Sequence, residues 1–353
     1  MQHPDLSSRL PLLITGIAGV TGSNALHYFQ TKYPGQVIGI RQRDNWRLKG
    51  PGIIACNAED PHALAKLFDH YEFRSVLNCA GNCALKACEL DPRMAWRTNV
   101  EGLLNLLAII VDKPVRLVHL SIDLVFSGRD RGPHAPGYVE SERHDPVTVF
   151  GKTMVSAEQL LADWIPQACV LRISLPMGVS FNGHAGAIDW IQSRFKHHRP
   201  ATLYFDEVRT PAYTDCLSRL FCKILASDIS GLFHTGGPRR LSLYEIAQIV
   251  NRVGGYDPNL LMGCPRIEAG PIPPRAGNVA MDSTKLANVF GGPLLSAWPY
   301  HEQFVPTSRD WHYHRGPEQG SEALLAETLY RNPSRTPTDD IDQKRKSRRL
   351  PVK

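Results

Sequence analysis

The chain has 353 residues, of which 42% are hydrophobic and 21% charged, enough for one large core or two smaller ones. Its net charge is +6, and about five of these charges belong to residues 331–353, where eight Lys and Arg stand against three Asp. The rest of the chain is close to neutral, which argues against a nucleic-acid-binding surface on the folded body.

The apolar runs indicate where the protein is located, and the cysteines indicate its redox state. No stretch of about eighteen apolar residues occurs, and the first apolar run is short and ends in glycine-rich sequence, so we expect a cytoplasmic protein without a membrane span or signal peptide. We interpret the cysteines as reduced core residues, and we favour this interpretation over a metal site for Cys79, Cys83 and Cys88. The eight are Cys56, Cys79, Cys83, Cys88, Cys169, Cys216, Cys222 and Cys264.

Short apolar runs alternate with helical stretches through the first half of the chain. The predicted strands are residues 10–14, 36–40, 52–55, 75–79, 115–120 and 169–173, and the predicted helices are 23–31, 62–70, 94–111 and 155–164. Near-continuous apolar strands separated by helices are typical of a parallel sheet that is covered on both faces. The predicted fold class is α/β, a Rossmann-type doubly wound parallel sheet.

After Leu175 the pattern becomes irregular, which indicates a smaller α/β substrate lobe with helices at 188–195, 217–226 and 243–253. Residues 263–277 contain four prolines and are predicted to be an extended loop. We therefore divide the chain into a Rossmann domain with strand returns from later sequence, a substrate lobe, a C-terminal wrap, and a basic tail predicted to be disordered. Their bounds are 1–175, 176–296, 297–332 and 333–353.

A glycine-rich loop follows the first predicted strand. Thr15, Gly16, Gly19 and Gly22 form the pattern TGxxGxxG between a strand and a helix. The first glycine allows a tight turn, the second lets backbone N–H groups approach a pyrophosphate, and the third permits close packing of helix on strand. Glycine also collects in turns for conformational reasons alone, but the flanking strand and helix favour a dinucleotide-binding loop from Thr15 to Gly22.

The end of the second strand bears on which dinucleotide is bound. NAD-binding proteins usually present an acid to the ribose there, whereas this chain has Arg41, Gln42 and Arg43. Two guanidinium groups suit the 2′-phosphate of NADP, so NADP is preferred. NAD stays open as an alternative, because the arginines could be solvated loop charges and Asp44 is near enough to supply an acid.

With these motifs the chain resembles the extended short-chain dehydrogenases, and among them the sugar-nucleotide-binding dTDP-4-dehydrorhamnose reductase group, over roughly residues 10–291. The segment 78–81 (NCAG) resembles the family's cofactor-lining turn, 121–128 (SIDLVFSG) its STDYVFDG segment, and 149–154 (VFGKTM) its VYGKTK segment. Asn99 matches a helix asparagine of the family, 209–211 its substrate-lobe turn, and 231–234 its GIYH strand.

The resemblance implies a cofactor site, a substrate site and a nucleotide-sugar ligand. Lys86 and Arg209 are the expected substrate contacts. The expected cofactor contacts are Thr15, Gly16, Ala18, Gly19, Val20, Thr21, Gly22, Arg41, Arg43, Asn57, Cys79, Ala80, Gly81, Asn99 and Ser121.

The family's catalytic positions depart from its pattern. A Tyr exchanges a proton with the sugar oxygen in the family, a Lys four residues later lowers the Tyr pKa, and a Ser or Thr orients the carbonyl. This chain has Phe150, Met154 and Ile122 at these positions, and none of the three can donate a proton. The weaker catalytic candidates are Ser121, Asp123 and Lys152, with a Thr148–Lys152 dyad on one helical face as an alternative. Tyr138 is a further polar residue near the expected cleft.

Two functional hypotheses follow. The first is a homologue of the reductases that binds a cofactor or ligand and acts as a regulatory protein, as the regulatory subunit of methionine adenosyltransferase, which resembles these reductases, does through a partner. The second is an oxidoreductase, epimerase or dehydratase on a nucleotide sugar that uses a non-standard acid and base. A protein partner or a homo-oligomer is compatible with the first. No metal site is assigned, since we interpret His312 and His314 as part of the C-terminal wrap. We interpret the 344–349 run (KRKSRR) as a solvated tail rather than a site for an acidic partner.

Overall fold

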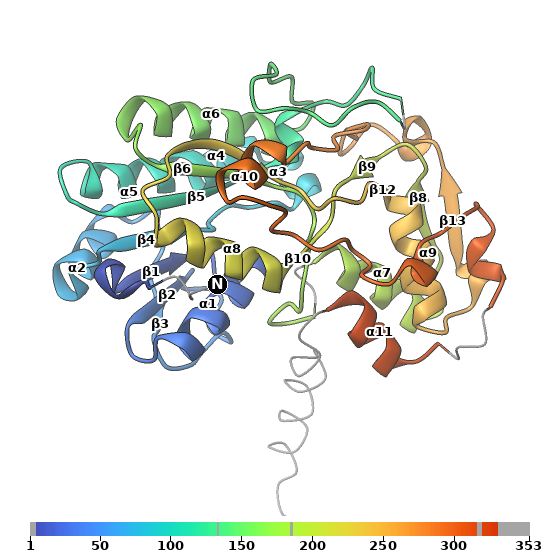
Figure 1. Cartoon of the computed structure of the whole chain (residues 1–353), viewed down its shortest axis with the longest axis horizontal. Coiled ribbons are helices and arrows are strands. Elements are labelled where there is room, and N and C mark those ends of the chain that lie inside the picture. The colour runs from blue at the N-terminus through green and yellow to red at the C-terminus, as the bar shows by residue number, and fades with distance from the viewer. Residues whose placement is uncertain (1–4, 133, 184–185, 316–319, 331–353) are drawn as a thin grey trace, which may run out of the picture.

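A seven-stranded parallel sheet forms the centre of the computed structural model, which describes residues 5–132, 134–183, 186–315 and 320–330. Its strand order is β11-β6-β5-β4-β1-β2-β3, so the chain reverses direction across the sheet between β3 and β4 (Figure 1). This is the doubly wound Rossmann arrangement that was predicted. The strands are β1 (Leu12–Thr15), β2 (Val37–Arg41), β3 (Ile53–Ala55), β4 (Ser75–Asn78), β5 (Arg116–Ile122), β6 (Cys169–Ile173) and β11 (Gly231–Thr235).

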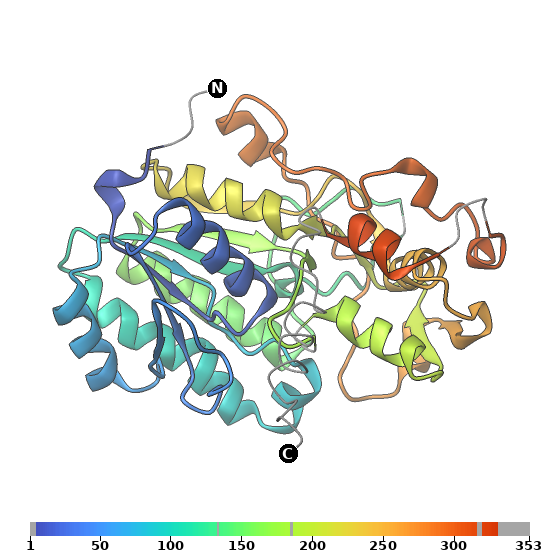
Figure 2. The same cartoon turned by 90° about the horizontal axis from the view of Figure 1, so that it is seen from below.

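Helices cover both faces of this sheet (Figure 2). On one face, α1 (Val20–Lys32) and α8 (Thr214–Leu225) pack through buried residues such as Phe29 and Phe221 against Ile14 and Leu171. On the other face, α2 (Pro61–Tyr71), α5 (Gly102–Ile110) and α6 (Val149–Trp164) bury side chains such as Leu107 against the same strands. Burial on both faces explains why the strand sequences are almost entirely apolar.

Two helices differ from their predicted limits for local reasons. The helix predicted at 155–164 begins six residues earlier, because Thr148 caps it by accepting a hydrogen bond from the Gly151 N–H at 2.9 Å. The helix predicted at 94–111 is three segments: α4 (Pro92–Trp96), one π-helical turn over Arg97–Glu101, and α5. The short α3 (Leu85–Leu90) precedes them and was not predicted.

A second group of elements forms a lobe beside the sheet, with its own buried core. It contains α7 (Ala187–Lys196), α9 (Leu243–Val253) and α11 (Glu322–Leu329), together with Trp298, Phe304 and Trp311 from the segment after residue 296. The short strand pairs of the lobe and its junction are β7 (Pro176–Met177) with β10 (Ala212–Tyr213), β9 (Val208–Arg209) with β12 (Leu241–Ser242), and β8 (Ala201–Tyr204) with β13 (Leu261–Cys264).

Two expectations about this part of the chain are wrong. The helix expected at 217–226 is α8, and it covers the main sheet instead of belonging to the lobe, because its apolar stripe packs against the strands and α1. The stretch 263–277 is not a loop throughout: it starts within β13, which pairs with β8, and a 3-10 turn follows at Arg266–Ala269. The expected disorder of the tail from residue 333 concerns residues outside the described ones, and the domain limits stay predictions.

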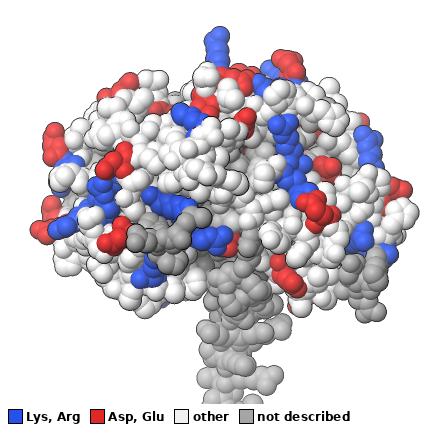
Figure 3. Space-filling view, in the orientation of Figure 1, with Lys and Arg blue, Asp and Glu red and all other residues white. Residues whose placement is uncertain are grey.

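Charges on the face seen in Figure 3 are interspersed, with Lys and Arg lying among Asp and Glu and wide uncharged areas between them. This distribution agrees with the near-neutral body inferred from composition. In the described part of the chain, no helix is long and apolar enough to cross a membrane.

Candidate functional site

The glycine loop between β1 and α1 has the close backbone contacts that its sequence predicts. Gly16 has a φ of +64°, and a Cβ on it would lie 2.2 Å from the carbonyl oxygen of Cys79. A Cβ on Gly22 would lie 2.4 Å from the carbonyl oxygen of Gly16. The loop therefore fits only with glycine at both positions, because each packs directly against backbone.

The N-terminus of α1 opens from this loop without a side-chain cap. Gly19 is the N-cap residue and has no side chain to accept a hydrogen bond. Helix geometry leaves the N–H groups of Val20, Thr21 and Gly22 without an acceptor one turn earlier. These N–H groups and the helix dipole favour an anion at this end, so the loop fits the pyrophosphate of a dinucleotide.

A buried row of polar side chains lies beneath the loop and crosses three neighbouring strands. Thr15 Oγ1 donates to Asn78 Oδ1 at 2.5 Å, and Asn78 Nδ2 lies 2.9 Å from His119 Nδ1. Thr15 Oγ1 also accepts from the Ala80 N–H at 3.1 Å. Burial lowers the pKa of His119 to about 4, so its ring is neutral at neutral pH. The row fixes the ends of β1 and β4 relative to each other.

At the end of β2 the two arginines differ in their surroundings. The guanidinium of Arg41 is engaged by the loop that follows, donating to the carbonyl oxygens of Leu48 at 2.7 Å and Gln42 at 2.9 Å. The side chain of Arg43 is 61% exposed and lies 3.2 Å from a carboxylate oxygen of Asp60, while the backbone N–H of Arg43 donates to Asn57 Oδ1. Arg43 is therefore the more exposed of the two arginines and is paired with Asp60, whereas Arg41 shapes the loop that follows β2.

The turn after β4 places Cys79 and Ala80 against the glycine loop, next to Gly16, while their role toward a cofactor stays a prediction. Asn99, in the π-helical turn, is buried and accepts from the Asn82 N–H at 2.6 Å. Its Nδ2 donates to Thr153 Oγ1 of α6 at 2.8 Å. Asn99 thus ties the turn after β4 to α6, and in this arrangement it contacts protein groups. Burial raises the pKa of the Cys79 thiol, which keeps it protonated.

The three residues that the resemblance places at the family's catalytic positions form part of an apolar cluster. Phe150 and Met154 lie one turn apart on α6, both are at least 95% buried, and they pack with Leu124 and Phe126. Ile122, at the end of β5, packs against the same cluster. No proton donor or acceptor is carried by these three side chains. The cluster can shelter an apolar or aromatic surface, but it cannot transfer protons.

The weaker catalytic candidates are engaged elsewhere. Ser121 donates to Glu158 Oε1 at 2.5 Å, and Glu158 also accepts from the fully buried Arg172, at 2.9 Å from its Nε. Asp123 is fully buried and forms an ion pair with Arg209. Lys152 is exposed on α6, and Thr148 caps that helix, so they do not form the dyad that their spacing allowed. Tyr138 is buried and stacks on Phe126.

The two expected substrate contacts differ strongly in solvent exposure. Lys86 is exposed on α3. Arg209 is 4% exposed, and its guanidinium donates to Asp123 Oδ2 through Nε at 2.6 Å. Ser174 Oγ donates to the same oxygen and accepts from the Thr210 N–H, so β9 is attached to the ends of β5 and β6. In this arrangement Arg209 binds protein, and its role toward a substrate stays a prediction.

Comparison with known proteins now assigns the family. The family model for the RmlD substrate binding domain matches residues 10–304. The chain belongs to this RmlD family. It is 25% identical over 250 residues to a probable low-salt glycan biosynthesis reductase of Haloferax volcanii, covering 70% of this chain and 81% of the relative. It is also 25% identical over 283 residues to a dTDP-4-keto-6-deoxy-D-glucose reductase of Streptomyces niveus, covering 78% and 91%.

A further relative and two solved structures complete the comparison. The chain is 25% identical over 258 residues to methionine adenosyltransferase 2 subunit beta of Xenopus laevis, covering 67% of this chain and 69% of the relative. The dTDP-4-dehydrorhamnose reductase of Bacillus anthracis, solved in complex with NADP, superposes with a TM-score of 0.70 at 17% identity and covers 81% of this chain and 95% of that one. The UDP-glucose 4-epimerase of Thermus thermophilus, solved with NAD, gives 0.69 at 20% identity and covers 86% and 98%. The structural likeness confirms the fold.

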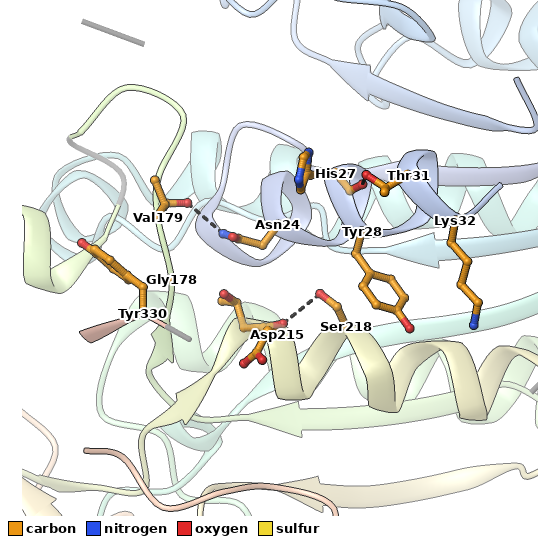
Figure 4. Close-up of a pocket in the computed structure, with 11 residues that line it drawn as sticks. Asn24, His27, Tyr28, Thr31, Lys32, Gly178, Val179, Asp215, Ser218 and Tyr330 are labelled. Atoms are coloured by element: carbon orange, nitrogen blue, oxygen red, sulfur yellow. Dashed lines mark hydrogen bonds between the residues drawn. The ribbon is translucent and has the colours of Figure 1, made fainter. Parts of the chain in front are cut away.

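A pocket of about 400 Å³ lies between α1 and α8 (Figure 4), and its lining does not include Ile122, Phe150 or Met154. Asn24, Tyr28 and Ser218 line it, together with Val179 of the loop after β7. Asn24 Nδ2 donates to the carbonyl oxygen of Val179 at 2.8 Å, so this loop of the lobe is attached to the helix that follows the glycine loop. None of its lining residues is in the predicted cofactor or catalytic sets.

The cysteine interpretation needs correction, since Cys83 is exposed and Cys79 and Cys264 are only half-buried, whereas the other five are in the core. Among the described residues the cysteines are free and no group of three or more metal-ligating side chains gathers. His312 is buried against Gln248 at 3.1 Å, and the exposed His314 lies 3.3 Å from Asp310. Sequence reasoning missed four residues whose roles depend on contacts between distant segments: Asn82, Thr153, Glu158 and Arg172. Of these, only Arg172 could have been noticed in the sequence, because it is a charged residue within the apolar strand 169–173.

Proposed function

We propose that this RmlD-family chain binds a nicotinamide dinucleotide at the Thr15–Gly22 loop, prefers NADP, and acts as a ligand-binding or regulatory protein without the family's proton chemistry. One observation carries the proposal. The dinucleotide cradle keeps its required glycines, whereas Ile122, Phe150 and Met154 belong to an apolar cluster. A reductase of this type needs a proton donor beside the reacting oxygen, and these side chains supply none.

The residues present fit the cofactor. Gly16 and Gly22 let the loop pack closely on the neighbouring backbone, the uncapped N-terminus of α1 meets the pyrophosphate charge, and Arg43 is the exposed cation for a 2′-phosphate. The bound group would supply a hydride acceptor or donor. The bound NADP in the Bacillus anthracis reductase and NAD in the Thermus thermophilus epimerase support a nicotinamide cofactor in general.

Fluorescence titration with NADPH and NADH tests the cofactor part of this proposal. We expect both to bind, NADPH more tightly. Arg43→Met should weaken NADPH binding about 5- to 10-fold and leave NADH binding nearly unchanged, because only NADPH carries the second phosphate. Arg74→Met, a change on the loop between α2 and β4, is the control. Equal affinities for the two dinucleotides in both the wild type and Arg43→Met would contradict the preference.

The regulatory role implies a protein partner, since a protein without turnover acts through what it binds. The relative named methionine adenosyltransferase 2 subunit beta supports this expectation. A nucleotide sugar is the proposed small ligand, because the Streptomyces niveus relative is named as a reductase of dTDP-4-keto-6-deoxy-D-glucose. Affinity purification of the tagged chain, with and without NADPH, should yield one stoichiometric partner. Recovery of the chain alone under both conditions would count against the regulatory role and favour a ligand-binding role by itself.

A further inference from the structure

The pocket between α1 and α8 has no part in the proposed function. We call it the α1–α8 pocket. Its volume of about 400 Å³ lies within the range of about 300–1,000 Å³ that is usual for small-molecule sites. On α1 its lining runs from Asn24 to Lys32, which corresponds to about 12 Å of helix. The pocket therefore accommodates a small molecule of elongated shape.

Much of the wall of this pocket is aromatic or apolar. Tyr28 is half-buried, and Figure 4 shows its ring extending from α1 toward α8. Burial raises the pKa of Tyr28 to about 12, so the ring carries no charge at neutral pH. Val179 lies at the end of the pocket away from Lys32, and Gly178 beside it has no side chain. A ligand body that covers these groups is therefore favoured if it is apolar.

Two of the polar side chains on α8 are already engaged with protein groups. Ser218 Oγ donates to the carbonyl oxygen of Thr214 at 2.8 Å (Figure 4). Asp215 forms an ion pair with Arg219 one turn later, at 2.8 Å. The negative charge of Asp215 is therefore balanced, and α8 does not oppose an anion in the pocket.

Lys32 contributes a positive charge that has no carboxylate partner among the described residues. Its Nζ lies 3.5 Å from Cys222 Sγ, and 6.0 Å and 5.4 Å from the ring centroids of Tyr28 and Tyr33. The side chain is half-buried, and Figure 4 shows it extending from α1 on the same side as Tyr28. An ammonium in partly desolvated surroundings interacts more strongly with an anion than a fully solvated one does. This end of the pocket therefore favours a carboxylate.

We propose that the α1–α8 pocket binds an amphipathic monocarboxylate, an organic acid with one carboxylate on an alkyl or aromatic body. The carboxylate pairs with Lys32, and the body covers Tyr28 and Val179. Acetate lacks the body, an alcohol lacks the charge, and an amine would be repelled by the ammonium. The lining excludes the Thr15–Gly22 loop and the apolar cluster at Ile122, so this site stands or fails separately from the proposed function.

Saturation-transfer NMR and calorimetry with octanoate and naphthylacetate test this site in the full-length chain without dinucleotide. We expect wild-type protein to bind at least one of these acids with a Kd below about 1 mM. Octanol and naphthylethanol carry the same bodies without the charge and should bind at least about 5-fold more weakly. Acetate at the same concentration should not compete.

Lys32→Met is the decisive variant, because it removes the charge and keeps much of the side-chain length. It should weaken binding of the acids about 5- to 10-fold and leave binding of the alcohols nearly unchanged. A general disturbance of the pocket would instead weaken both. Lys66→Met, on the exposed face of α2, is the matched control and should bind the acids as wild type does. If Lys32→Met does not fold, wild type in about 0.5 M NaCl decides, since salt should weaken binding of the acids alone.

The outcomes that overturn the proposal are distinct from a failure of the proposed function. The proposal fails if wild type binds neither acid, or if Lys32→Met loses acid and alcohol binding equally. It also fails if NADPH displaces the bound acid, because the acid would then lie at the dinucleotide loop. Acid binding that depends on Lys32 in a chain that binds no NADPH would contradict the proposed function and support this site.

Discussion

At the scale of single residues, the backbone around Gly16 has the least tolerance for change. Gly16 has a left-handed φ, and backbone atoms of the turn after β4 occupy the space that a side chain on Gly16 would take. Gly35 has a similar φ of +75°, yet nothing lies within 4 Å of a Cβ built on it. Comparing substitutions at Gly16 and Gly35 therefore separates the free-energy cost of a left-handed φ from the cost of the steric contact with Cys79.

Gly16→Ala should lower the free energy of unfolding by at least about 2 kcal/mol and abolish NADPH binding, because the methyl group must displace the Cys79 carbonyl. Gly35→Ala should cost only about 1 kcal/mol and leave binding intact. Urea unfolding and fluorescence titration measure both effects. Equal losses in the two variants would show that the contact with Cys79 does not matter.

The buried ion pair between Asp123 and Arg209 is a second residue-scale feature with a large expected effect. Arg209→Met should destabilise the protein by about 3–5 kcal/mol, because it leaves a fully buried carboxylate unpaired. Arg219→Met removes the exposed pair with Asp215 on α8 and should change stability by less than about 1 kcal/mol. Chemical denaturation of both variants checks the contrast. A small effect of Arg209→Met would mean that Asp123 is already neutral.

At the scale of elements, much of the Rossmann half was predictable because its strands are short apolar runs between helices. β6 was predicted to the residue, and β1, β2 and α2 to within two residues at each end. The glycine loop was predictable for the same reason, since its chemistry lies in consecutive residues. The errors have long-range causes: α8 and β13 follow irregular sequence and are placed by packing on α1 and β8. The contacts of Ser121, Asp123 and Arg209 also depend on partners far along the chain.

The start of α6 gives a prediction about a single element. Thr148→Ala removes the N-cap hydrogen bond to Gly151 and should destabilise the protein by about 1–2 kcal/mol. Thr148→Ser keeps the hydroxyl and should recover most of this loss. Thermal unfolding measures the stabilities, and NADPH titration provides the second readout. If Thr148→Ala lost dinucleotide binding while its stability was unchanged, the hydroxyl would have a role in the site instead of in the cap.

At the scale of the whole molecule, buried histidines make stability depend on pH. Burial lowers the pKa of His119 from 6.5 to about 4 and also lowers the pKa values of His144 and His234. The unfolded chain therefore binds more protons than the folded one below about pH 6.5. Stability is at its full value above that pH and decreases as the pH is lowered toward 4.

His119 alone should cost about 1.4 kcal/mol of unfolding free energy at pH 5.5, one unit below its unperturbed pKa. Urea unfolding at pH 7.5 and pH 5.5 checks this, with the His119→Asn variant as the comparison. The variant should show a smaller decrease between the two pH values than the wild type does. A stability that stays constant or increases on acidification would contradict the burial of neutral histidines.

The central claim, that the chain retains dinucleotide binding without the family's proton chemistry, is tested most directly by NADPH oxidation with a 4-keto nucleotide sugar. Wild-type protein at a concentration above the Kd for NADPH should oxidise none of it above the protein-free rate, although titration shows the cofactor bound. The account would be contradicted by wild-type turnover that is lost in Gly16→Ala, because a working acid must then lie beside the nicotinamide in place of Phe150.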